Sequence, residues 1–123
     1  MIRRRSEALP RDVRITKKAD FERAKGEGVW IRGSSFDLIF KKGPLDVTRL
    51  GIIVPLYSHK VVERNRLKRI VREVMRRFVM PEMIEPYDIV VKAKRNAYEA
   101  DYKSIQLELR GLASKFREGR NGN

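Results

Sequence analysis

Short apolar runs, separated by turn-forming residues, predict four β-strands. In the second run, Phe36, Leu38 and Phe40 alternate with other residues, so they are expected to share one face of a sheet. Pro55 ends the third run, because proline has no backbone N–H to donate to a neighbouring strand. The predicted strands are residues 29–31, 36–40, 50–54 and 87–91.

Apolar residues spaced three or four apart predict three helices around these strands. The first covers residues 17–25, with Thr16 as its cap and with Gly26 and Gly28 beyond its end. The second covers about residues 59–78 and the third about residues 97–116. One stripe of the long central helix is predicted to be core, and it comprises Leu67, Ile70, Val71, Val74 and Phe78.

The element order αβββαβα predicts a single α+β domain with a four-stranded mixed sheet and helices packed on it. A length of 123 residues fits one domain. We assign residues 1–15 to a basic N-terminal arm, 10–117 to the domain and 118–123 to a flexible tail. The strand–helix–strand unit of residues 50–91 should be parallel, and general rules favour a right-handed crossover.

The charge balance changes the expected partner. Lys and Arg number 29 against 16 Asp and Glu, which gives a net charge of +13. This excess repels itself and favours a negatively charged partner, with nucleic acid ahead of a membrane surface or an acidic protein. No apolar run is long enough to span a bilayer, and no apolar segment follows the basic start. Cysteine is absent, so a cytoplasmic protein is expected.

Positive charge is concentrated on the long central helix. Residues 59–79 include eight Lys and Arg, with only Glu63 and Glu73 as acids. An ordinary solvated helix face usually mixes signs, because like charges three or four residues apart repel, and the last helix does mix them. The pattern therefore favours a phosphate-binding surface over a merely solvated one. Its candidate nucleic-acid-binding residues are Arg64, Asn65, Arg66, Lys68, Arg69, Arg72 and Arg76.

Asn65 stands out within this basic run, because an amide is neither a cation nor a strong helix former. Two interpretations stay open. The side chain helps to satisfy free backbone groups near the start of the helix. Alternatively, it hydrogen-bonds to a ribose, to a base edge or to the hydration shell of a phosphate-bound Mg²⁺.

The sequence offers no set of residues for catalysis. Phosphodiester hydrolysis by protein groups needs clustered carboxylates for metal ions or a pair of histidines. His59 is the only histidine, and Asp37, Asp46 and Asp88 fall on separate predicted elements. The chain also has no Walker loop, no GxGxxG and no His/Cys metal-ligand spacing. We predict no catalytic residue and no protein-bound metal.

The central motif resembles the signature of the protein subunit of bacterial ribonuclease P. It reads Arg64-Asn65-Arg66-Leu67-Lys68-Arg69 and continues with Arg72-Glu73. The match covers roughly residues 10 to 117, and its further pieces follow in family order. These pieces are Arg14-Ile15, Asp20-Phe21, Arg49-Leu50-Gly51-Ile52, Asp88-Ile89-Val90-Val91 and Ala93-Lys94-Arg95.

The resemblance implies a left-handed crossover around the long helix and a function carried by RNA. The protein would bind the catalytic RNA and help it to remove the 5′ leader from precursor tRNA, with Mg²⁺ associated with the RNA and no obligate protein partner. A cleft between the first helix and the sheet would hold the single-stranded leader. Phe21, Lys25 and Ile39 would line it, although Phe21 and Ile39 are also plausible as plain packing residues.

The chain departs from the family pattern after the third strand. The family usually has Ser-Lys-Lys followed by a Gly, and here these places hold Pro55-Leu56-Tyr57 and His59. Lys25 also stands where a second aromatic residue is common. Two other functions remain as alternatives. One is a basic ribosomal or other structural RNA-binding protein without a role in cleavage, and the other is a stand-alone nuclease.

Overall fold

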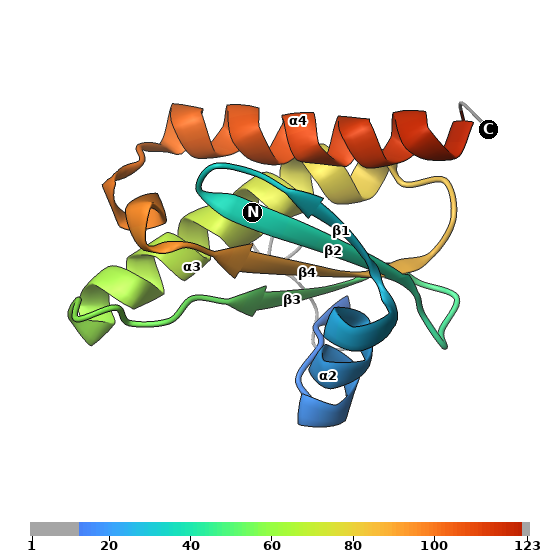
Figure 1. The fold of residues 1–123 in the computed structure, drawn as a ribbon, viewed down its shortest axis with the longest axis horizontal. Helices are drawn as coiled ribbons and strands as arrows, with labels where there is room; N and C mark the ends of the chain where they lie inside the picture. The colour runs from blue at the N-terminus through green and yellow to red at the C-terminus, as the bar shows by residue number, and fades with distance from the viewer. Residues whose placement is uncertain (1–12, 122–123) are drawn as a thin grey trace, which may run out of the picture.

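A computed structural model describes residues 13–121, which form one sheet with helices on both faces (Figure 1). Most of the predicted basic arm and the last two residues lie outside the described residues. The order αβββαβα and the α+β class are confirmed. The strands are β1 (Val29–Arg32), β2 (Phe36–Lys42), β3 (Arg49–Ile53) and β4 (Tyr87–Ala93), and the α-helices are α2 (Lys18–Glu27), α3 (Val61–Val74) and α4 (Tyr102–Asn121).

The sheet is mixed, as predicted, with the strand order β1-β2-β4-β3. Strands β1 and β4 both run antiparallel to β2, whereas β3 is parallel to β4. Helix α3 is the crossover between β3 and β4, and its handedness stays a prediction of the resemblance. Strand β3 is an edge strand, and the N-terminal segment begins to cover it, since the Ile15 N–H donates to the Leu50 carbonyl at 2.9 Å.

Alternation along β2 divides the core between the two faces of the sheet. Phe36, Leu38 and Phe40 belong to the large cluster that α3 and α4 cover, as the sequence predicted. The Phe40 ring stacks on Phe116 of α4 with a centroid separation of 3.9 Å. Ile39 points to the other face, where it packs in a smaller cluster beneath α2. Each face of the sheet therefore has its own apolar layer.

Several helix ends differ from the predicted ones. Helix α2 has Lys17 at its N-cap with no side-chain cap, so the predicted cap by Thr16 is wrong. Helix α3 begins at Val61 rather than His59, because the backbone of Lys60 at its N-cap is extended, with φ of −81° and ψ of 155°. Just before it, Tyr57 and Ser58 have positive φ values of 48° and 74°. Helix α4 starts later than predicted, at Tyr102, and runs on to Asn121, through part of the segment assigned to a tail.

The buried stripe of α3 is mostly as predicted. Leu67, Val71 and Val74 are buried. After Val74 the backbone makes a π-helical turn, Met75–Val79, which places Met75 and Val79 in the core. A π-turn has more residues per turn than an α-helix, so the apolar period shifts. This shift explains why Phe78, predicted to be core, is only partly buried.

Nowhere between residues 13 and 121 is there a helix long and apolar enough to cross a membrane.

Candidate nucleic-acid interface

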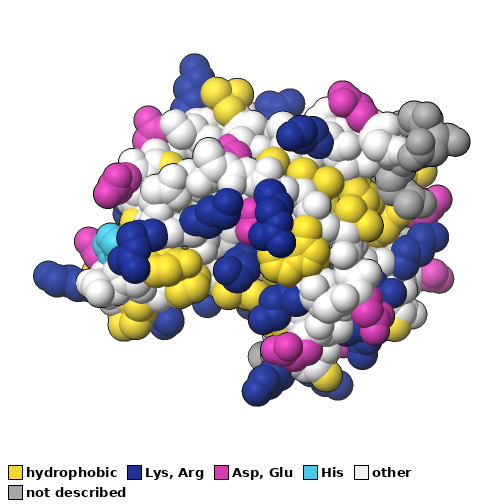
Figure 2. Space-filling model, viewed as in Figure 1, with side chains coloured by type: hydrophobic (Ala, Val, Ile, Leu, Met, Phe, Trp, Pro, Cys, Tyr) yellow, Lys and Arg dark blue, Asp and Glu magenta, His cyan; other side chains and the backbone are white. Residues whose placement is uncertain are grey.

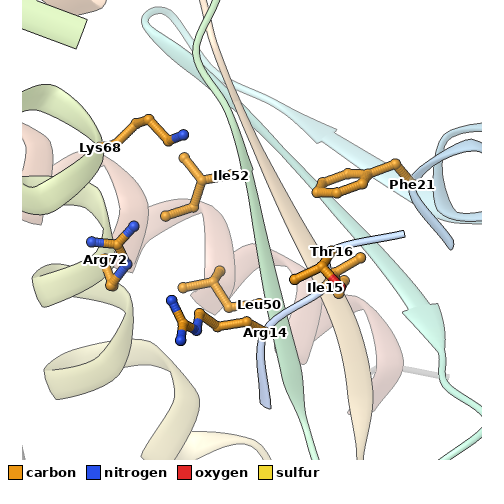
Figure 3. A pocket seen from close by; sticks show the side chains of 8 residues that line it. All are labelled: Arg14, Ile15, Thr16, Phe21, Leu50, Ile52, Lys68 and Arg72. Carbon is orange, nitrogen blue, oxygen red and sulfur yellow. The ribbon is translucent and has the colours of Figure 1, made fainter. Parts of the chain in front are cut away.

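A groove of about 340 Å³ opens at the β3 edge of the sheet (Figure 3). Its walls come from three places: the segment before α2, strand β3 with the Phe21 ring of α2, and the facing side of α3. None of the residues that line it is acidic. They are Arg14, Ile15, Thr16, Phe21, Leu50, Ile52, Lys68 and Arg72.

Three cations converge on this groove: Arg14 from the N-terminal segment, and Lys68 and Arg72 from α3. None of them forms an ion pair with an acidic residue in the described part of the chain. Burial lowers the pKa of Lys68, and the neighbouring charges of Arg64 and Arg72 lower it further. Burial and the charge of Arg14 likewise lower the pKa of Arg72. A bound anion would relieve this repulsion, so the groove fits a phosphate.

The remaining candidate cations on α3 lie around this groove rather than in it. Arg64 is four residues before Lys68, so it continues the same line along the helix. Its Nε is buried without a hydrogen-bond partner among the described residues. Arg69 is exposed, and Arg76 is half-buried in the π-helical turn. Arg66 lies on another flank of α3 and lines a separate hollow beside Tyr98.

Asn65 is exposed, and the structure tests whether its side chain satisfies free backbone groups at the start of α3. Glu63, not Asn65, satisfies the free backbone there, because its carboxylate accepts a hydrogen bond from the Lys60 N–H at 2.9 Å. The capping interpretation of Asn65 is therefore wrong. Its side chain forms no hydrogen bond with any residue from 13 to 121, which leaves the amide free to contact a ligand.

Phe21 closes the groove on the α2 side. Its ring lies against β3 so closely that a Cβ atom on Gly51 would be 2.6 Å from the ring. Only glycine at position 51 permits this approach. The ring is half-buried, and part of it faces the groove (Figure 3). Phe21 is therefore both a packing residue and a surface on which a base can stack.

The other two predicted cleft residues do not line the groove. Lys25 is half-buried one turn further along α2, with its ammonium 3.7 Å from the Glu22 carboxylate. Ile39 is fully buried, and it is so close to the end of α2 that a Cβ on Gly28 would lie 2.8 Å from it. The expectation that Ile39 lines an open cleft is corrected, because it supports α2 from beneath.

A buried ion cluster that the sequence did not predict fixes α2 on the sheet. The Arg49 guanidinium donates to both oxygens of Asp88, from Nε at 2.9 Å and from Nη2 at 2.7 Å. Its Nη1 also lies 3.5 Å from the Asp20 carboxylate of α2. The hydrogen bonds that Arg49 donates to Asp88 are the main reason that the pKa of Arg49 is raised. All three residues belong to family motif pieces, but their contact joins distant parts of the chain.

A second basic region lies on the part of the sheet face that α2 leaves open. Arg32, Lys92 and Lys94 project there around Asp37, whose carboxylate lies 3.5 Å from Arg32 and 3.4 Å from Lys94. The Arg32 guanidinium also lies over the Trp30 ring at 4.5 Å. Figure 2 shows Lys and Arg side chains gathered in the middle of the visible face, with hydrophobic side chains beside them.

Comparisons with known proteins agree with this combination of fold and basic surface. The family model for ribonuclease P matches residues 9–117. A ribonuclease P protein component from Thermotoga petrophila is 36% identical over an alignment of 117 residues, and the match covers 90% of this chain and 97% of the relative. The solved RNase P protein of Staphylococcus aureus is 31% identical with a TM-score of 0.75, and the match covers 83% of this chain and 93% of that one.

The RNase P protein of Thermotoga maritima gives a similar result, with 31% identity and a TM-score of 0.73 over 83% of this chain and 96% of that one. These matches run along nearly the whole length of each relative, and they include the central basic motif within the matched residues. This chain therefore belongs to the ribonuclease P protein family.

Proposed function

We propose that this chain is the RNA-binding protein subunit of ribonuclease P, and that it helps a catalytic RNA to remove the 5′ leader from precursor tRNA. The observation that carries the proposal is the groove in which Arg14, Lys68 and Arg72 converge without an acidic partner. The family match supports the same function and does not favour the alternative of a structural RNA-binding protein without a role in cleavage.

In this proposal the residues inside the groove and the exposed residues of α3 beside it bind different parts of the RNA. The three groove cations bind phosphates, for which Arg and Lys are well suited. Asn65 and Arg69, which are exposed beside the groove, contact the catalytic RNA. The Phe21 ring offers a stacking surface to a base of the single-stranded leader, because stacking on an aromatic ring needs no particular base.

The chemical step belongs to the RNA partner. Among the described residues there is no cluster of three or more His, Cys, Asp or Glu side chains that fits a metal ion. We propose that the RNA and the substrate hold the Mg²⁺ ions. We propose no obligate protein partner, and the cytoplasmic location stays a prediction.

Binding of the protein to the catalytic RNA is expected to depend strongly on salt. If the basic surface neutralises about five phosphates, log K should fall against log[salt] with a slope of roughly −3.5 to −4.5. Titrations of the RNA at several NaCl concentrations measure this slope. Replacing both Lys68 and Arg72 by glutamine should reduce its magnitude by about 1.5. A nearly flat slope for the wild type would exclude the basic surface as the main contact.

A further inference from the structure

The loop between β3 and α3 contains two adjacent residues in a conformation that L side chains rarely adopt. Tyr57 has φ of 48° and Ser58 has φ of 74°, and neither is glycine. Such backbone geometry persists only where its surroundings hold it, and it is concentrated at functional sites.

Contacts with the end of β4 hold the loop in this shape. The Tyr57 hydroxyl donates to the Ala93 carbonyl at 3.3 Å, and Arg95 donates from Nη1 to the Tyr57 carbonyl, also at 3.3 Å. The Arg95 guanidinium lies over the Tyr57 ring, 4.8 Å from its centroid. On the other side of the loop, the Tyr98 hydroxyl donates to the Pro55 carbonyl at 2.8 Å. The backbone is therefore constrained to present the ring and the guanidinium together.

The Tyr57–Arg95 pair lies at the far end of a basic path that begins near Phe21. Lys92 and Lys94 lie on the open sheet face between the two, and Lys92 forms no ion pair with any residue that the structure describes. The acid of this region, Asp37, is only 3% exposed, so it contributes little negative surface. Tyr57 is six positions beyond Gly51, which lies beneath Phe21, so the path is at most about 20 Å long.

We propose that Tyr57 and Arg95 form a nucleobase-stacking subsite for a leader nucleotide distal to the one at Phe21. This inference rests on the proposed function. Bases of single-stranded RNA stack on aromatic rings and on arginine planes, and basic side chains along the path attract the intervening phosphates. Arg95 is exposed and the Tyr57 ring is half-exposed, so both are accessible to a base.

The test compares precursor tRNAs with leaders of graded length, from none to about eight nucleotides, bound to the reconstituted holoenzyme. Tyr57→Ala is expected to weaken binding by about 5- to 100-fold, but only for leaders long enough to reach the loop. Tyr57→Phe, which keeps the ring, should bind like the wild type. Mature tRNA, which has no leader, should bind equally to all three proteins.

Phe21→Ala distinguishes failure of the subsite from failure of the proposed leader site. If Phe21→Ala weakens binding of leader-bearing tRNA and Tyr57→Ala does not at any length, the subsite is wrong and the leader site stands. If the wild type itself does not prefer precursor over mature tRNA, the leader site is wrong as well.

Crosslinking gives a second measurement that does not depend on the folding of a variant. Wild-type holoenzyme is bound to precursor tRNA that has one photoreactive uridine at successive leader positions. Distal positions are expected to crosslink to the peptide that contains Tyr57, and proximal positions to the peptide that contains Phe21. Distal crosslinks that map only to other peptides would overturn the proposal.

Discussion

Replacing Asp88 by alanine is expected to lower the free energy of unfolding by about 3–5 kcal/mol. Asp88 is only 2% exposed, and it accepts two hydrogen bonds from Arg49. The variant leaves the guanidinium in a buried place with a single contact, to Asp20 at 3.5 Å. An unpaired buried charge costs far more than the net contribution of the pair, and this asymmetry explains the large expected effect.

Urea unfolding followed by circular dichroism measures the effect of Asp88→Ala. Glu27→Ala is the matched control, because Glu27 also joins α2 to the sheet, through Lys41 at 3.5 Å, but its side chain is 64% exposed. The control should cost less than about 1 kcal/mol. The double variant Arg49→Met/Asp88→Val should regain most of the loss, since it removes both charges of the buried pair. Equal costs for Asp88→Ala and Glu27→Ala would show that the buried cluster does not hold α2 in place.

The second large effect is expected on RNA binding. Replacing Lys68 and Arg72 by glutamine should weaken binding of the catalytic RNA by about 1–3 kcal/mol for each residue, because each loses a charge-assisted contact with a phosphate. The melting temperature of the free protein should not fall. Lys68 has like charges four residues away on both sides, Arg64 and Arg72, and each such pair costs a few tenths of a kcal/mol.

The lowered pKa values of Lys68 and Arg72 also predict that the glutamine substitutions do not destabilise the free protein. A lysine whose pKa is lower in the folded than in the unfolded protein is destabilising below the folded pKa, where it is charged in both states. Neutral glutamine removes this penalty at neutral pH. Lys115→Gln on α4 is the control for RNA affinity, because Lys115 is an exposed cation outside the groove. An equal loss of affinity for the control would contradict a localised site.

Leu67→Ala, on the core side of the same helix, is expected to lower stability, unlike the glutamine variants at Lys68 and Arg72. Leu67 is 4% exposed within the main core, and its truncation should cost about 2–5 kcal/mol of stability through a cavity. Calorimetry of the three variants separates the two sides of α3. If the glutamine variants at Lys68 and Arg72 melted as early as Leu67→Ala, the division of α3 into a core side and an RNA side would be wrong.

Local pattern was enough to predict the element order and the two faces of β2. Alternation placed Phe36, Leu38 and Phe40 on one face because side-chain direction in a strand follows directly from sequence position. The same logic located most of the α3 core stripe. It failed at Phe78, which is only partly buried whereas Val79 is in the core, because the π-helical turn changes the period and no residue in the sequence marks such a turn.

Features that depend on contacts between residues far apart in the chain could not be predicted from the sequence. The Arg49–Asp88 pair joins residues 39 apart, and no local pattern indicates which carboxylate an arginine will meet. Positive φ at Tyr57 and Ser58 is equally hidden, since glycine or asparagine would normally mark it. The groove was only half predicted, because its α3 cations follow from charge pattern, whereas Arg14 joins them through the fold.

Cleavage of precursor tRNA tests the central claim most directly. The assay compares the purified protein, the catalytic RNA of ribonuclease P from the same organism, and the two together, at a Mg²⁺ concentration where the RNA alone is slow. The protein alone should not cleave, and its addition should speed removal of the 5′ leader by the RNA. Cleavage by the protein alone, or an RNA rate that the protein leaves unchanged, would contradict the assignment as the ribonuclease P subunit.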